Sequence, residues 1–303
     1  MKLKVTLLII FTVVALLYYV LPHPSLPTSS TITMFQKGMK NAEVLNLQHE
    51  LSTLKCFEGT FTGIYDTNTV DAVKNFQTQN KLPIDGVVDI HTFNLIADKI
   101  ITLKKVVVMI DPGHGGADGG TVSGNAIEKE ITLGISLKLK KLVEALGYNA
   151  QMTRETDISL TSLTQPNGIS TWETRDLKAR ASIINKSKAR VFLSIHVNSF
   201  PEATAINGAS LYYSDVYPQS KGLAKAIQTS LNNITSEGFV RQARESSKVG
   251  FLLLRRATVP GVLIETGFLS NQQERDLLMT EAFRDKTAKA ILDGLLASKI
   301  LEN

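Results

Sequence analysis

Apolar runs and amphipathic stretches alternate along the chain from Lys104 to its end. Val106–Ile110 is continuously apolar and ends in a glycine-rich turn, as in a strand buried on both faces. Ile131–Leu146 has apolar residues at helical spacing and is followed by Gly147, a frequent helix terminator. The same pattern predicts strands near 149–153, 191–195 and 261–264, and helices near 176–184, 219–234 and toward the C-terminus. This alternation predicts an α/β fold: a layered, mostly parallel sheet with helices on both faces.

The preceding segment, Met34–Ala97, shows only the helical period. Its apolar residues recur every three or four positions: Val44, Leu47, Leu51 and Leu54 in a first stretch, and Val70, Val73 and Phe76 in a second. Asp66 or Thr67 can cap the second helix, and Gly59 and Gly63 lie in the loop between the two. We therefore expect a small domain of short helices before the α/β domain, joined to it by a short connection at Asp98–Lys105.

The N-terminus carries a targeting pattern. Met1–Lys4 is basic, and Val5–Leu21 is apolar apart from two threonines, which fits a signal peptide or a short membrane anchor. The lysines keep this end inside the cell, so the rest of the chain is expected to be exported. Residues 22–33 are rich in Pro, Ser and Thr and predict a linker. Because no convincing cleavage motif follows Leu21, we favour an uncleaved anchor over a removed signal.

The composition restricts the partners and the chemistry. A net charge of +5 and a pI near 9.1 favour an anionic partner. No run of alternating basic and aromatic residues indicates a nucleic-acid surface, so we expect no nucleic acid; anionic polymers or lipid headgroups suit the charge. The single cysteine, Cys56, excludes an intramolecular disulfide and a cysteine-based zinc knuckle.

Polar side chains end three of the predicted strands. His114 follows the first strand, His196 ends the second and Glu265 the third, while Glu128 precedes the long helix. Functional residues are expected at the carboxyl ends of such strands. Two histidines, a carboxylate and a separate acid suit a catalytic zinc site, because three protein ligands leave a coordination position for water. Taken singly, each has a structural alternative: a loop or core histidine, or an acid at a helix start. The glycines around His114 do not form a phosphate-binding motif.

Six segments occur together in the order of a known family. They are Asp111-Pro-Gly-His-Gly-Gly116, Ile127-Glu-Lys-Glu-Ile-Thr-Leu133, Thr153-Arg154 with Asp157, Arg180 with Asn185, Ser194-Ile-His-Val-Asn198 and Val262-Leu-Ile-Glu-Thr-Gly-Phe-Leu-Ser-Asn271. This set resembles the zinc N-acetylmuramoyl-L-alanine amidases. The resemblance implies a catalytic domain at 104–303, with His114, Glu128 and His196 as zinc ligands and Glu265 as the catalytic acid. It also implies the bond cleaved, the amide between the lactyl group of N-acetylmuramic acid and L-alanine of the stem peptide.

The helical segment carries a second resemblance. Its motifs are Gln36-Lys-Gly38, Val44-Leu-Asn-Leu-Gln48, Gly63-Ile-Tyr-Asp-Thr-Asn-Thr69, Ala72-Val-Lys-Asn-Phe-Gln77, Leu82-Pro-Ile-Asp-Gly86 and His91-Thr92. They resemble the three-helix peptidoglycan-binding module of wall hydrolases, which implies an all-α module at 34–100. The expected partners are then peptidoglycan, anionic wall polymers and, through residues 1–21, the membrane. The expected location is outside the cell, anchored and facing the wall or secreted to it.

One departure from the family pattern is a longer segment at Ser159–Thr174, which contains Trp172. With Leu254-Arg-Arg-Ala257, it resembles the sporulation and germination branch. We predict Arg255 and Asn198 as substrate-binding residues, with Arg255 or its neighbour Arg256 also able to stabilise an oxyanion. Two alternatives stay open: a zinc peptidase that cuts within the stem peptide, and a non-catalytic wall-binding regulator.

Overall fold

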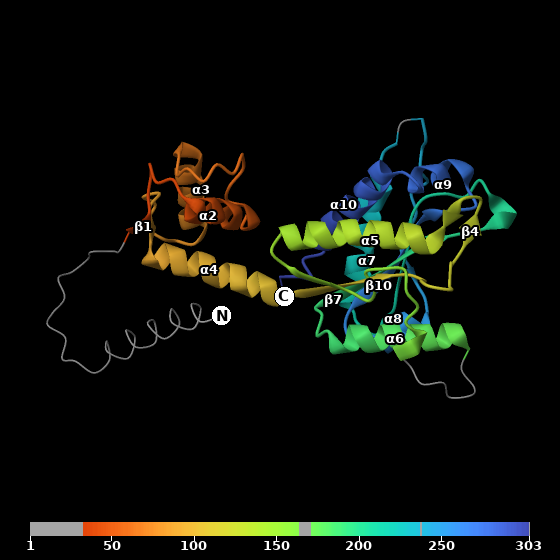
Figure 1. Ribbon diagram of the computed structural model, residues 1–303. Coiled ribbons are helices and arrows are strands. Elements are labelled where there is room, and N and C mark those ends of the chain that lie inside the picture. The colour runs from red at the N-terminus through yellow and green to blue at the C-terminus, as the bar shows by residue number, and fades with distance from the viewer. Residues whose placement is uncertain (1–32, 164–170, 237, 303) are drawn as a thin grey trace.

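The computed structural model describes residues 33–163, 171–236 and 238–302, which form a small helical module followed by an α/β domain (Figure 1). The predicted targeting segment 1–21 lies outside the described residues, as do nearly all of the predicted linker 22–33 and part of the long segment 159–174. Within the described ranges, no helix has both the length and the apolar character needed to cross a membrane.

Three helices form the module, as expected. They are α2 (Ala42–Thr53), α3 (Thr67–Gln79) and α4 (Ile90–Lys105). Each begins at a side chain that accepts a backbone N–H of its first turn: Asn41 at 2.8 Å, Asp66 at 3.0 Å and Asp89 at 2.7 Å. The sequence did not reveal a short antiparallel pair between β1 (Thr33–Phe35) and β2 (Val88–Asp89). Strands of two or three residues are too short for a periodic pattern.

The short connection between the two domains is helical. Helix α4 continues through the predicted connection at Asp98–Lys105, and the first strand of the sheet begins at Val107. The helix can extend this far because Ile96 and Ile100 keep its inner face buried in the module core. At the junction, Gly147 lies so close to the end of α2 that an added Cβ would be 2.7 Å from Thr53 Cγ2. The module therefore packs directly against the α/β domain.

The α/β domain is built on a six-stranded sheet with the order β6-β3-β7-β10-β8-β9. Neighbouring strands are parallel except β10 and β8, which are antiparallel. The strands are β3 (Val107–Pro112), β6 (Asn149–Met152), β7 (Val191–Asn198), β8 (Ser210–Tyr213), β9 (Ser247–Lys248) and β10 (Gly261–Phe268). The predicted mostly parallel sheet is confirmed, with β8 and β9 as two additional strands, of which β9 forms the edge.

Helices cover both faces of the sheet (Figure 1). Helices α5 (Glu128–Ala145), α7 (Gln219–Asn232) and α10 (Glu281–Ala297) pack on one face, and α6 (Trp172–Lys186) and α8 (Leu252–Arg256) pack on the other. Helix α9 (Gln272–Leu278) follows the end of β10, and the short turns η1 (Thr161–Leu163) and η2 (Pro201–Ala203) lie in connections. The predicted layered α/β architecture is confirmed.

Alternation along the central strands fixes which side chains face which layer. On β7, Val191, Leu193, Ile195 and Val197 belong to the core beneath α5, α7 and α10, whereas Phe192 belongs to the core beneath α6 and α8. Side chains of a strand alternate between its two faces, so His196, four positions after Phe192, lies on this second side as well. The parallel register sets His196 beside Glu265 of β10. The carboxyl ends of β3, β7 and β10 thus bring the predicted site residues to one edge.

Candidate metal centre and active site

The turn after β3 carries the first histidine in a conformation that few side chains adopt. His114 has a φ of +61°, in the left-handed region. The preceding residue must be small, because a Cβ on Gly113 would lie 2.3 Å from Cε1 of His196. Gly120 is similarly constrained, since its Cβ would lie 2.6 Å from Oε2 of Glu128. These glycines let the two histidines and the carboxylate approach one another.

Two buried arginines hold the backbone of this turn. Arg180 donates to the carbonyl of Pro112 at 2.6 Å and to that of His114 at 2.5 Å. Arg154 donates to the carbonyl of Gly113 at 2.7 Å. With three successive carbonyls bound, the turn has little freedom to reorient His114. The arginine motifs identified in the sequence therefore support the site from beneath.

Asp111, at the end of β3, is fully buried beside one of these arginines. It accepts hydrogen bonds from Arg180, Thr153 and Ser194 at 2.8, 2.6 and 2.7 Å. Burial opposes ionisation, but the Arg180 charge and these three donors outweigh it and lower the pKa of Asp111. A buried carboxylate that is fully hydrogen-bonded to a buried guanidinium is a structural element, since removing either partner would leave an uncompensated charge.

The three predicted ligands converge at the sheet edge. Nε2 of His114 and Nδ1 of His196 each lie 3.1 Å from Oε1 of Glu128, and the two imidazoles meet edge-on with centroids 5.0 Å apart. One ligand atom from each residue lies within 4.8 Å of the other two. This spacing is compatible with a single ion bonded to all three at about 2 Å.

Local backbone structure aims Glu128 at this point. The short hairpin of β4 (Val122–Ser123) and β5 (Ala126–Ile127) delivers it to the start of α5. Its Oε2 accepts from the Thr121 N–H at 2.8 Å and its Oε1 from the Val197 N–H at 3.0 Å. Burial raises the pKa of Glu128, but hydrogen bonds and charges of the two histidines dominate and lower it strongly. Glu128 is therefore held as a carboxylate, the form that binds a metal.

Asp118 is a site residue that the sequence analysis missed. Its Oδ2 lies 2.8 Å from Nδ1 of His114, and its Oδ1 accepts the Gly120 N–H at 3.0 Å. This contact orients the imidazole so that Nε2 points to Glu128, the arrangement that usually supports a metal-binding histidine. Burial lowers the pKa of His114, but the hydrogen bonds and charges of Glu128 and Asp118 raise it to about 9. The only sequence signal was an acid four residues after a histidine in a glycine-rich turn.

Glu265 stands beside the cluster but outside it. It is paired in register with His196 on one side and with Ser210 on the other. Its Oε2 is enclosed and has no hydrogen-bond partner among the described residues. Burial raises its pKa to about 7, with His196 opposing the rise and Glu128 adding to it. An enclosed carboxyl group that titrates near neutrality is suited to accepting and returning a proton.

The two predicted substrate-binding residues occupy different places. Asn198 ends β7 on the same side of the strand as His196, and its Oδ1 accepts the Ser199 N–H at 2.7 Å. Arg255 is exposed on the short helix α8, which precedes β10 in the chain. Asn198 thus lies on the side of β7 that carries His196, and substrate binding by Arg255 stays a prediction. Trp172 is half-buried and opens α6.

Comparison with known proteins agrees with this geometry. A family described as N-acetylmuramoyl-L-alanine amidase matches residues 108–297, and a putative peptidoglycan binding domain matches residues 40–96. The germination-specific N-acetylmuramoyl-L-alanine amidase of Bacillus subtilis is 36% identical over 196 residues, which cover 65% of this chain and 81% of that protein.

Solved structures are similar over the same region. The CwlD amidase from Clostridioides difficile, solved in complex with the GerS lipoprotein, has 36% identity and a TM-score of 0.57, covering 64% of this chain and 98% of that one. The N-acetylmuramoyl-L-alanine amidase AmiC2 of Nostoc punctiforme has 29% identity and a TM-score of 0.53, covering 64% and 96%.

The family match spans well over half of the chain and includes every residue of the cluster. The match at 40–96 falls within the three-helix module. Both resemblances predicted from the sequence are thereby confirmed. The chain belongs to the N-acetylmuramoyl-L-alanine amidase family, and it is a peptidoglycan hydrolase that cleaves the amide between N-acetylmuramic acid and L-alanine.

Proposed function

We propose that His114, Glu128 and His196 hold a catalytic zinc ion and that Glu265 moves the protons of the amide hydrolysis. The observation that carries this proposal is the convergence of three ligand atoms within 4.8 Å of one another, beside an enclosed carboxyl group without a partner. Two imidazole nitrogens and one carboxylate oxygen form a donor set that suits zinc.

The surroundings of the donors fit this metal. Asp118 leaves Nε2 of His114 free to face the cluster, and backbone N–H groups fix both oxygens of Glu128. Three protein ligands are typical of catalytic zinc, which keeps another position for water. When bound, zinc lowers the pKa of its water and polarises the scissile carbonyl.

Glu265 supplies the proton transfer. Its pKa of about 7 lets it take a proton from the attacking water and release that proton to the departing alanine nitrogen. Its Oε2 has no hydrogen-bond partner among the described residues, so no such bond competes with either proton transfer. The arginine-bound turn and the Asp111 pair keep the histidines in place while these protons move.

The products of cleavage test this proposal against a peptidase. Purified wall or a soluble muropeptide should gain free N-terminal alanine, and chelation should stop the reaction until zinc is restored. A new amino terminus deeper in the peptide would identify a zinc peptidase instead. Metal binding without any cleavage would favour the alternative of a wall-binding regulator.

We propose that the helical module holds the enzyme on the wall without contributing to the cleavage site. Its core is separate from the two cores of the catalytic domain. Helix α4 ends where β3 begins, whereas His114 follows the end of β3, so the strand separates them by about 20 Å. A fragment that begins near Thr102 should cleave a small muropeptide at close to the full-length rate but act more weakly on intact wall.

Two outcomes of that truncation would contradict the proposed role. Equal action of both proteins on intact wall would mean that the module is a spacer or binds something else. Loss of activity on the small substrate would mean that the module supports the catalytic fold, through contacts such as that between Thr53 and Gly147.

Export and physiological role are proposed on different grounds. The basic and then apolar residues 1–21 favour export and membrane attachment, and the positive charge suits anionic wall polymers. The similarity to a germination-specific amidase supports a role in sporulation or germination. Fractionation of cells that express the tagged chain, together with its time of expression, tests both.

A further inference from the structure

Arg244 lies at the edge of the site, on the far side of Glu265 from the metal ligands. Its Nε donates to Ser210 Oγ at 2.7 Å, and its guanidinium carbon lies 5.3 Å from the centroid of the Phe268 ring. Ser210 is directly opposite Glu265 in the antiparallel pair of β8 and β10, so both side chains project from the same face. The guanidinium is therefore held by the residue that lies opposite Glu265 across the strand pair.

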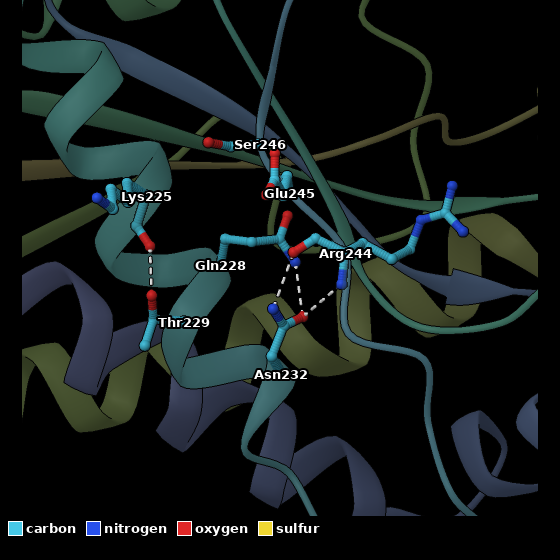
Figure 2. Close-up of a pocket in the computed structure, with 7 residues that line it drawn as sticks. All are labelled: Lys225, Gln228, Thr229, Asn232, Arg244, Glu245 and Ser246. Atoms are coloured by element: carbon cyan, nitrogen blue, oxygen red, sulfur yellow. Dashed lines mark hydrogen bonds between the residues drawn. The ribbon is translucent and has the colours of Figure 1, made fainter.

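The backbone at Arg244 is fixed by an amide side chain of α7. Asn232 accepts the Arg244 N–H at 3.2 Å and donates to the Arg244 carbonyl at 2.8 Å. Gln228 supports it by donating to Asn232 Oδ1 and to the Ala209 carbonyl, both at 2.9 Å. Figure 2 shows Gln228 and Asn232 gathered against this backbone, while the guanidinium of Arg244 extends away from the pocket they line.

Two further contacts hold the same loop against the catalytic domain. Gly208 lies so close to the loop that an added Cβ would be 2.1 Å from the Gln242 carbonyl oxygen. Arg241, buried, donates to Glu274 at 2.7 Å and to the Thr266 carbonyl at 2.5 Å. The chain is thus anchored on both sides of Arg244, which limits the entropy that its side chain would lose on binding.

No described residue neutralises the charge of Arg244 through an ion pair. Among the described residues, it forms no ion pair, and its two terminal nitrogens form no hydrogen bond. Arg241, only three residues away, is fully paired. Tyr212 responds to both charges: burial and Glu265 raise its pKa, and Arg244 opposes the rise. A half-buried, oriented guanidinium with two free nitrogens is suited to binding a carboxylate in bidentate fashion.

We propose that Arg244 is a substrate-binding residue that recognises a carboxylate of the stem peptide, an inference that rests on the proposed function. The lactyl carboxyl group is tied up in the scissile amide, and N-acetylated sugars are uncharged. The anionic groups nearest the scissile bond therefore belong to the peptide. Arg244 lies beyond Glu265, the group that delivers the proton to the alanine nitrogen, and so on the side where the peptide departs. Phe268 supports the guanidinium plane from beneath.

The test compares two soluble muramoyl peptides, one with free carboxylates and one in which these are carboxamides. Wild-type, zinc-loaded, full-length enzyme should cleave the carboxylate form with a kcat/KM about ten- to a hundredfold higher, the size expected of a hydrogen-bonded charge pair. Arg244→Gln should remove this preference by raising KM for the carboxylate substrate alone. Arg244→Lys should keep part of it, because a point charge loses the bidentate geometry.

Lys225→Gln is the matched control. It removes the same charge from an exposed residue of the pocket on the other side of the loop, and it should leave the preference intact. Equal cleavage of both substrates by the wild type would overturn the inference without any variant. So would a preference that survives in Arg244→Gln. If the zinc-loaded wild type released alanine from neither substrate, the proposed function would itself fail, and the two failures are therefore distinguishable.

Discussion

Replacing Glu265 by Gln should stabilise the metal-free protein at neutral pH while it removes most of the activity. Burial is the largest cause that raises the pKa of Glu265 from 4.5 to about 7. The folded state therefore holds this proton more tightly than the unfolded chain does. Sign and window follow: the stability that Glu265 contributes is fully present below about pH 4.5 and is lost as the pH rises through about 7.

The size of the effect follows from the same shift. A pKa of about 7 in place of 4.5 corresponds to about 3 kcal/mol. Solvent reaches the half-buried side chain, although its Oε2 is enclosed, and reduces this to about 1–2 kcal/mol. Gln cannot ionise. The advantage of Glu265→Gln should therefore be near zero at acidic pH and should approach this value at about pH 8.

Urea unfolding of chelator-treated proteins at about pH 5 and about pH 8 measures this difference. Glu144→Gln, at an exposed position of α5, is the control and should show no pH-dependent gain. Zinc should shrink the advantage, because a nearby cation favours the carboxylate. Turnover of the zinc-loaded variant should fall by about 10²–10⁴-fold. An equal gain at both pH values, or turnover close to the parent, would refute the reasoning.

Three further changes probe the metal centre. Glu128→Gln should remove most bound zinc, as measured by equilibrium dialysis, whereas Glu130→Gln, at an exposed position, should not. The opposite result would identify Glu130 as the metal ligand. Asp118→Asn should keep the fold and weaken zinc binding by about 10–100-fold, since it loses the group that orients the first histidine. Gly113→Ala should abolish both metal binding and activity, because its Cβ would lie 2.3 Å from the second histidine's ring. Gly222 lies in helix α7, and a Cβ added there would have no atom within 4 Å. Gly222→Ala should therefore raise the thermal unfolding temperature slightly.

Much of the fold and the chemical part of the site could be predicted because both depend on local pattern. Continuous apolar runs identify buried parallel strands, and residues that follow such strands meet at one sheet edge. This reasoning is enough to place His114, His196 and Glu265 together from their positions in the sequence. Glu128 depended on the family resemblance, since an acid at a helix start has an ordinary electrostatic explanation.

The rest depends on contacts between residues that are distant in sequence. Strand β8, Ser210–Tyr213, has only four residues and a polar start, so it has little periodic signal. Arg244 reaches Ser210 across 34 residues, through a loop without a repeating pattern. Arg255, chosen from its motif and its charge, lies on the short helix α8. Spacing along the chain gives no reason to select Arg244, whereas its contacts in the folded protein do.

The pairing of buried charge separates the residues that build this site from those that act in it. Arg154, Arg180 and Arg241 are all buried, and each donates to backbone carbonyls, two of them also to carboxylates. Such groups hold the fold, because removal of one partner leaves a buried charge uncompensated, at about 3–5 kcal/mol. Glu265 and Arg244 differ, since within the described part of the chain each keeps polar atoms without a partner. The stability of the fold does not explain why these two side chains keep unpaired polar atoms. Ionisable groups with perturbed pKa values or without partners are typical of functional sites. Ser210 connects the two residues, because it lies opposite Glu265 across the strand pair and its Oγ accepts a hydrogen bond from Arg244. We therefore assign proton transfer to Glu265 and substrate binding to Arg244.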